Sequence, residues 1–114
     1  MKKLILVISI ISITAVLFSC SKSEDNNTGS GIPGPKFLAA KSIISGSCAL
    51  SGCHINPSNT GGLNFESDVN IVAAGSRIKA RAVDLGTMPP TGALSAANKT
   101  TIADWINAGG RLTD

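Results

Sequence analysis

The sequence predicts a small all-α domain, and three observations support this. Apolar residues recur at helical spacing, most clearly after Ser95, where Ile102, Trp105 and Ile106 form one face. Ser, Gly and Pro stand where helices begin and end. No stretch shows the two-residue alternation of a strand. We therefore expect three to five short helices joined by long loops.

The first predicted helix covers residues 36–45. It follows Pro35, a residue suited to a helix start, and ends near Gly46. Its inward positions are Phe37, Ala40 and Ile44.

Three more helices are predicted from their caps. Ser67 is the expected N-cap of the second, and Ser76 that of the third, which stops at Gly86. The last helix, capped by Ser95, ends at Gly109 and Gly110. The inward positions of the second and third helices are predicted to be Val69, Val72, Ala73, Ile78 and Val83.

The amino terminus has the pattern of an export signal. Lys2 and Lys3 precede residues 4–18, which carry no charge. This run is short for a bilayer span, which needs roughly 20 apolar residues, and suits a signal-peptide core. We expect residues 1–19 to be a signal peptide. An uncleaved anchor is the alternative, and it would hold the domain at a membrane as a lipid anchor would.

The segment LFSC, which ends at Cys20, resembles the lipobox of bacterial lipoproteins. The resemblance implies that Cys20 is lipidated after cleavage. Residues 21–35 are polar and rich in Gly and Pro, so residues 20–35 are expected to be the lipidated cysteine and a flexible linker. The globular domain is then residues 36–114.

Charge and size limit what this domain can be. The chain carries a formal charge of +3, but Lys2 and Lys3 belong to the signal, so no basic patch for nucleic acid is predicted. A domain this small often needs disulfides, a metal or a cofactor for stability. Aromatic residues make up only 4% of the chain, so we expect something else to fill its centre.

The cysteines are the first candidates for chemistry. Three cysteines in an exported protein are an odd number, and lipidation of Cys20 would leave Cys48 and Cys53 as a pair. His54, the single histidine, follows directly. The pair can form a disulfide, bind a metal or attach haem. Zinc is disfavoured, because these residues supply three ligands and no further His or Cys closes a structural site.

Covalent haem attachment usually requires C-x-x-C-H. The stretch C-A-L-S-G-C-H, residues 48–54, has the same order with two extra residues, and Gly52 can let the longer loop fold back. Haem iron in electron-transfer cytochromes commonly takes histidine and methionine as axial ligands. Met1 belongs to the signal, so Met88 is the remaining methionine.

At LGTMPPTGALS, residues 85–95, and the helix after it, the chain resembles the small monohaem cytochrome c family. The resemblance runs from about Phe37 to Leu112 and implies a cytochrome c-like fold around one covalently bound haem c. It implies that Trp105 packs the last helix on the first. The implied site residues are Cys48 and Cys53 as thioether sites, His54 as proximal ligand and Met88 as distal ligand.

The resemblance also implies a function. The protein is expected to be an electron carrier, not an enzyme. It is expected to be monomeric, lipid-anchored at the cell envelope and facing the periplasm or the cell surface, with redox proteins as partners. Two alternatives remain open: a haem sensor or haem enzyme from which Met88 is displaced, and a haem-free lipoprotein binding module stapled by Cys48 and Cys53.

Two finer expectations concern the surroundings of the haem. One or two of Arg77, Lys79 and Arg81 are spaced to meet the haem propionates, although a solvated helix face explains them equally well. The second imidazole nitrogen of His54 is expected to donate to a backbone carbonyl of the following loop.

Overall fold

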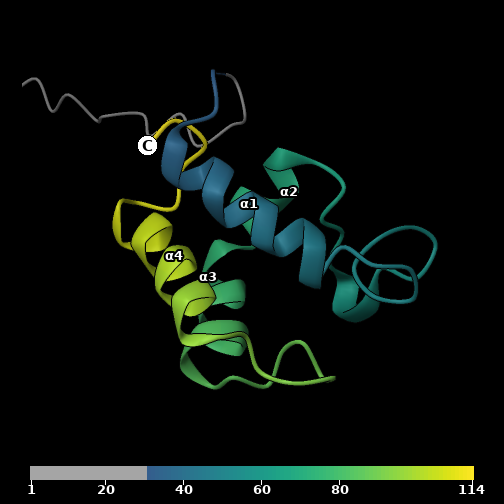
Figure 1. Ribbon diagram of the computed structural model, residues 1–114. Coiled ribbons are helices and arrows are strands. Elements are labelled where there is room, and N and C mark those ends of the chain that lie inside the picture. The colour runs from purple at the N-terminus through teal and green to yellow at the C-terminus, as the bar shows by residue number, and fades with distance from the viewer. Residues whose placement is uncertain (1–30) are drawn as a thin grey trace, which may run out of the picture.

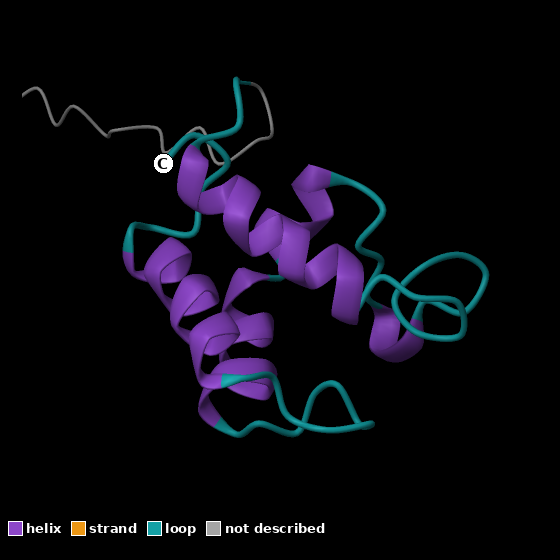
Figure 2. Cartoon of the chain, in the orientation of Figure 1, coloured by secondary structure: helices purple, strands orange, loops and turns teal. Residues whose placement is uncertain are grey.

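The computed structural model describes residues 31–114, and within this range the chain forms helices and no strand (Figures 1 and 2). The all-α prediction is therefore confirmed for the described residues. The predicted signal peptide, Cys20 and residues 21–30 of the predicted linker lie outside them. No helix within 31–114 is long and apolar enough to cross a membrane. The elements are α1 (Pro35–Ser47), a 3-10 turn η1 (Thr60–Gly62), α2 (Asp68–Ala73), α3 (Gly75–Ile78), a π-helical segment η2 (Lys79–Asp84) and α4 (Ala96–Asn107).

Helix α1 begins at Pro35, as predicted, but its cap comes from the other end of the chain. The carboxylate of Asp114 accepts hydrogen bonds from the backbone N–H groups of Lys36 (2.8 Å) and Phe37 (2.9 Å). These donors have no partner inside the helix, and a carboxylate is favoured at a helix amino terminus. A Cβ on Gly34 would lie only 2.5 Å from the Asp114 side chain, so this approach requires glycine.

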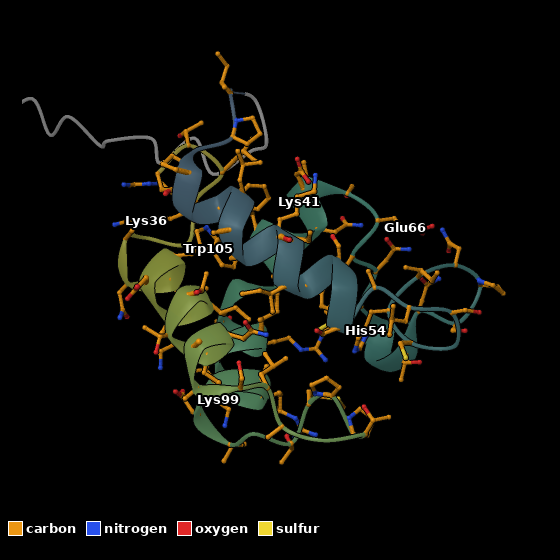
Figure 3. The ribbon with its side chains drawn as sticks, viewed as in Figure 1. Lys36, Lys41, His54, Glu66, Lys99 and Trp105 are labelled. Carbon is orange, nitrogen blue, oxygen red and sulfur yellow. The ribbon has the colours of Figure 1, made fainter. Side chains whose placement is uncertain are left out.

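The core lies where α1 packs against α4. Trp105 is fully buried and meets Phe37 edge to face, with ring centroids 5.6 Å apart. Its indole nitrogen donates to the carbonyl of Arg111 at 2.7 Å, so the buried polar atom is satisfied. The predicted packing of Trp105 against the first helix is confirmed, and Figure 3 shows the side chain between the two helices.

The caps are partly as predicted. Ser67 accepts from Asn70 N–H (3.3 Å) at the start of α2, as expected. The predicted Ser76 cap is wrong. A capping residue needs an extended backbone, whereas Ala74 is already helical (φ −91°, ψ 0°) and α3 begins at Gly75. Ser76 therefore lies inside the helix.

The inward face of α2 also differs from the prediction. Val69 is 49% exposed and Ala73 is exposed, whereas Ile71 and Ala74 are buried. With α2 only six residues long, its orientation follows from the close approach of the next turn to α4. A Cβ on Gly75 would lie 3.1 Å from Cδ1 of Ile106, so glycine permits that approach. Val72 and Ile78 are buried and Val83 partly buried, in line with the prediction.

Two long loops lie on the same side of the α1–α4 pair (Figure 1). The first connects α1 to α2 and includes residues 48–66. The second connects η2 to α4 and covers residues 85–95; Gly86, near its start, has a φ of +63°, which confirms the predicted helix stop. Ser95 caps α4 by accepting from Asn98 N–H at 3.2 Å, also as predicted. The candidate site residues lie in these two loops.

Replacing Trp105 should show how far the fold depends on this core. We expect Trp105→Ala to lower the free energy of unfolding by about 3–5 kcal/mol, because the cavity cannot collapse between two helices. Denaturant unfolding followed by circular dichroism measures the change. Leu85→Ala is the control: Leu85 is 65% exposed, so its loss should cost less than about 0.5 kcal/mol. Equal midpoints for Trp105→Ala and the parent would contradict the assigned packing.

Candidate functional site

Cys48 caps the carboxyl end of α1. Its N–H donates to Ile44 O at 2.8 Å, which fixes the residue at the last turn, and its side chain is buried. Burial raises the pKa of the Cys48 thiol, and nearby Cys53 raises it further. Both cysteines are free thiols in the structure. At neutral pH, Cys48 is therefore a protonated thiol in an apolar setting.

The four residues between the cysteines form a compact turn. Cys53 N–H donates to Leu50 O at 2.9 Å, and His54 N–H reaches back to Cys48 O at 3.2 Å. Gly52 adopts a φ of +79°, a conformation that costs other residues free energy. The longer C-x4-C spacing is thus absorbed by a local turn, and His54 follows directly beside the end of α1.

The imidazole of His54 packs on Phe65. The ring centroids are 4.8 Å apart, and Phe65 N–H donates to His54 O at 2.7 Å. Nδ1 of His54 is buried and has no hydrogen-bond partner among the described residues. The expected hydrogen bond from the imidazole to a backbone carbonyl is therefore not formed by this nitrogen. Leaving a buried ring nitrogen unpaired costs free energy.

The second loop presents Met88. The N–H groups of Thr87 and Met88 both donate to the carbonyl of Arg81, at 2.8 Å and 3.1 Å, and the Thr87 hydroxyl donates to it at 3.2 Å. Arg81 lies in η2, so these bonds tie the loop to the preceding helical segment. The Met88 side chain is partly buried and packs against the core.

The two loops meet around a cavity of about 400 Å³, to which Cys48, His54 and Met88 all contribute. A second cavity of about 160 Å³ shares these three residues and adds Cys53. The structure thus brings all four predicted site residues of the domain to adjoining cavities. Cys20, the predicted lipidation site, lies outside the described residues.

Most of the remaining lining of the larger cavity is apolar or uncharged. Two cations are the exception: Arg77, whose guanidinium donates to Gly61 O at 3.1 Å, and Arg81. Lys79 is not part of the lining, because its ammonium pairs with Asp84 at 2.8 Å. The uncharged lining residues are Thr60, Gly61, Leu63, Phe65, Ile78, Ala80 and Ala82.

The groups available for chemistry at this cavity are an imidazole, a thiol and a thioether. An imidazole suits iron, copper and zinc, and a thioether suits soft or borderline metals. Among residues 31–114, no three His, Cys, Asp or Glu side chains gather as a set that could hold a metal ion. Cys48, Cys53 and His54 accordingly do not form a closed three-ligand cluster.

Sequence reasoning missed the polar residues that hold the His54 loop. One carboxylate oxygen of Glu66, Oε2, accepts from Asn64 Nδ2 at 2.5 Å and from the Nδ2 and N–H groups of Asn56 at 2.7 Å and 3.2 Å. These hydrogen bonds lower the pKa of Glu66, and the bond from Asn64 has the largest effect. The carboxylate is therefore ionised at neutral pH. The three asparagines between residues 56 and 64 were the available signal, since asparagine favours turns with side-chain hydrogen bonds.

The lowered pKa of Glu66 gives a pH-dependent prediction. A depressed pKa in the folded protein stabilises it above the ordinary value of 4.5, and this contribution is lost as pH falls through the folded pKa. We expect the parent to be more stable than Glu66→Gln above pH 4.5, and the difference to shrink below it. Unfolding curves over a pH series measure this. A difference that does not change with pH would contradict the prediction.

Comparison of the chain with family models, with curated proteins and with solved structures finds no match. Its function is therefore inferred from the residues that line the cavity and from the sequence pattern around them.

Proposed function

We propose that the chain is a monohaem c-type cytochrome that transfers single electrons at the cell envelope. The observation that carries the proposal is the convergence of Cys48, His54 and Met88 on one cavity. Cys48 and His54 lie close together in the first loop, while Met88 comes from a second loop that is distant in the sequence. The C-x4-C-H and Met-Pro pattern predicts two iron ligands on separate segments, with the attachment cysteines beside one of these ligands.

The residues present fit a haem group in three respects. The cavity of about 400 Å³ falls in the range of cofactor sites, and its walls are mainly apolar. Its donors are an imidazole and a thioether, the pair common in electron-transfer cytochromes. The candidate attachment cysteines also lie at the site, because Cys48 lines this cavity and Cys53 lines the adjoining one.

Each side chain then has a role. Cys48 and Cys53 would each add a thiol across a vinyl group, forming a carbon–sulfur bond while the thiol hydrogen passes to the neighbouring carbon. His54 and Met88 would be the two protein ligands that hold the iron. When bound, haem supplies an iron that gains or loses one electron. A cytochrome c-like fold, export through residues 1–19 and anchoring through Cys20 belong to the same proposal.

Covalent attachment provides the first test. Denaturing electrophoresis with haem staining, on protein from a host able to mature cytochromes, should give a stained band, since thioethers survive denaturation. Cys48→Ala with Cys53→Ala is the control and should not stain. An unstained parent would overturn the proposal and favour a haem-free, disulfide-stapled module.

Replacement of Met88 tests the distal ligand. We expect Met88→Ala to keep its haem, to lose the charge-transfer absorption band of ferric thioether ligation, and to have a lower reduction potential, because methionine ligation raises it. Spectra of both oxidation states and a redox titration measure these changes. An unchanged spectrum and potential would show that Met88 is not a ligand. Rapid carbon monoxide binding by the reduced parent would instead favour a haem sensor or enzyme.

The two arginines at the cavity offer a further prediction. Arg77 and Arg81 line the cavity and are proposed to face the haem carboxylates, whereas Lys79 pairs with Asp84. Arg77→Gln should lower the reduction potential, because losing a nearby positive charge favours the oxidised iron. Lys79→Gln removes a charge of the same sign two residues away, at the start of η2, and should lower the potential less. Equal shifts in the two variants would contradict this placement.

A further inference from the structure

The loop that carries His54 is closed by a single carboxylate. Oε2 of Glu66 accepts three hydrogen bonds, two from Asn56 and one from Asn64, so the end of the loop is tied to the second residue after the histidine. Hydrogen bonds to an ionised acceptor are about twice as strong as those between neutral groups. Glu66 is therefore the centre of this closure.

The asparagines complete a ring around Glu66. Asn59 donates to Asn56 Oδ1 at 2.8 Å, Asn64 donates to Asn59 Oδ1 at 2.8 Å, and Glu66 N–H donates to Asn64 Oδ1 at 2.8 Å. Asn59 has a φ of +41°, a left-handed conformation that asparagine tolerates well. We call these four residues, Asn56, Asn59, Asn64 and Glu66, the loop clamp.

The loop clamp lies directly beside the contact between His54 and Phe65. Phe65 stands between two clamp members in the sequence, Asn64 and Glu66, and Asn56 is two residues after His54. The backbone bond from Phe65 N–H to His54 O, at 2.7 Å, joins the two segments that the clamp holds together. The clamp thus fixes the backbone on both sides of the aromatic contact.

The imidazole depends on this contact for its orientation. Metal-binding histidines are commonly oriented by a hydrogen bond from the ring nitrogen that does not bind the metal. Nδ1 of His54 is buried without a partner within residues 31–114, whereas the ring of Phe65 lies 4.8 Å from the imidazole centroid. Packing against Phe65 therefore takes the place of that hydrogen bond, and the position of Phe65 is set by the residues on either side of it.

We propose that Glu66 is the positioning residue for His54: through the loop clamp it holds Phe65 against the imidazole and so sets the orientation of the proximal ligand. The inference rests on the proposed haem function. It assigns a role to a carboxylate that is exposed and distant in sequence from the predicted ligands. Glu66 acts through Asn56, Asn64 and Phe65, not by contact with the cofactor.

The test uses the full chain with haem attached. In the oxidised protein, proton NMR resolves the hyperfine-shifted resonances of the His54 imidazole, which report its orientation at the iron. Glu66→Ala removes the acceptor and should shift these resonances; Glu66→Gln keeps a neutral acceptor oxygen and should shift them less. Asp68→Asn is the matched control, because Asp68 is two residues away but pairs with Lys41 on α1 at 2.6 Å. It should leave the resonances unchanged.

The outcomes separate positioning from a merely structural role. If Glu66→Ala lowers the thermal midpoint but leaves the imidazole resonances in place, the proposal is overturned. It is also overturned if Asp68→Asn shifts them as much as Glu66→Ala. A graded shift from parent through Gln to Ala supports it.

Failure of the haem proposal would be seen separately. A parent without attached haem overturns the proposed function, and the clamp is then measured on the haem-free chain. Nuclear Overhauser contacts between the rings of His54 and Phe65 should be present in the parent and Asp68→Asn and weakened in Glu66→Ala. Contacts of equal intensity in all three would overturn the role of Glu66.

Discussion

The edge-to-face contact between Phe37 and Trp105 is the interaction on which the rest of the structure depends. It joins the first and last helices, and both rings are fully buried. Aromatic pairs of this geometry contribute about 0.5–1.5 kcal/mol beyond the burial of their area. Helix α1 ends beside Cys48, and α4 follows the loop that presents Met88, so this contact joins the two helices to which the cavity-lining loops are attached.

The two walls are held in different ways. The His54 loop is braced by side chains on its exposed surface, where the loop clamp gathers on Glu66. The Met88 loop is braced by the backbone, because Arg81 O, near the end of η2, accepts from Thr87 and Met88. The last carbonyls of a helix lack partners within it and are free to accept such bonds. The His54 loop therefore depends on the ionised side chain of Glu66, and the Met88 loop depends on the helical geometry of η2, which precedes it.

Charge is unevenly distributed around the cavity. Its donors are a protonated thiol at Cys48, whose pKa burial raises, the imidazole of His54 and the thioether of Met88. The positive charges in the lining are those of Arg77 and Arg81. For the proposed electron carrier, the cofactor would lie in an apolar setting, where electrostatic interactions are stronger than in water. Cations at the wall would then interact with the acidic groups of the cofactor.

The sequence by itself determined the features that depend on neighbours a few residues apart. The all-α class, the Ser67 and Ser95 caps and the stop at Gly86 follow from helical spacing and cap chemistry, which act within about one turn. It also indicated which residues carry chemistry, because Cys48, Cys53, His54 and Met88 stand out by type and order. Their roles as haem ligands and attachment sites stay predictions.

Only the tertiary structure decided the features that depend on distant segments. Ser76 lies inside α3 and does not cap it, because the helix already begins at Gly75. Val69 and Ala73 face solvent, because Gly75 packs tightly against α4. No local sequence pattern predicts three further features. Arg77 lines the cavity and Lys79 does not, Phe65 packs on His54, and the loop closes on Glu66. Each is set by which surfaces meet when the helices pack, and spacing along the chain does not contain that information.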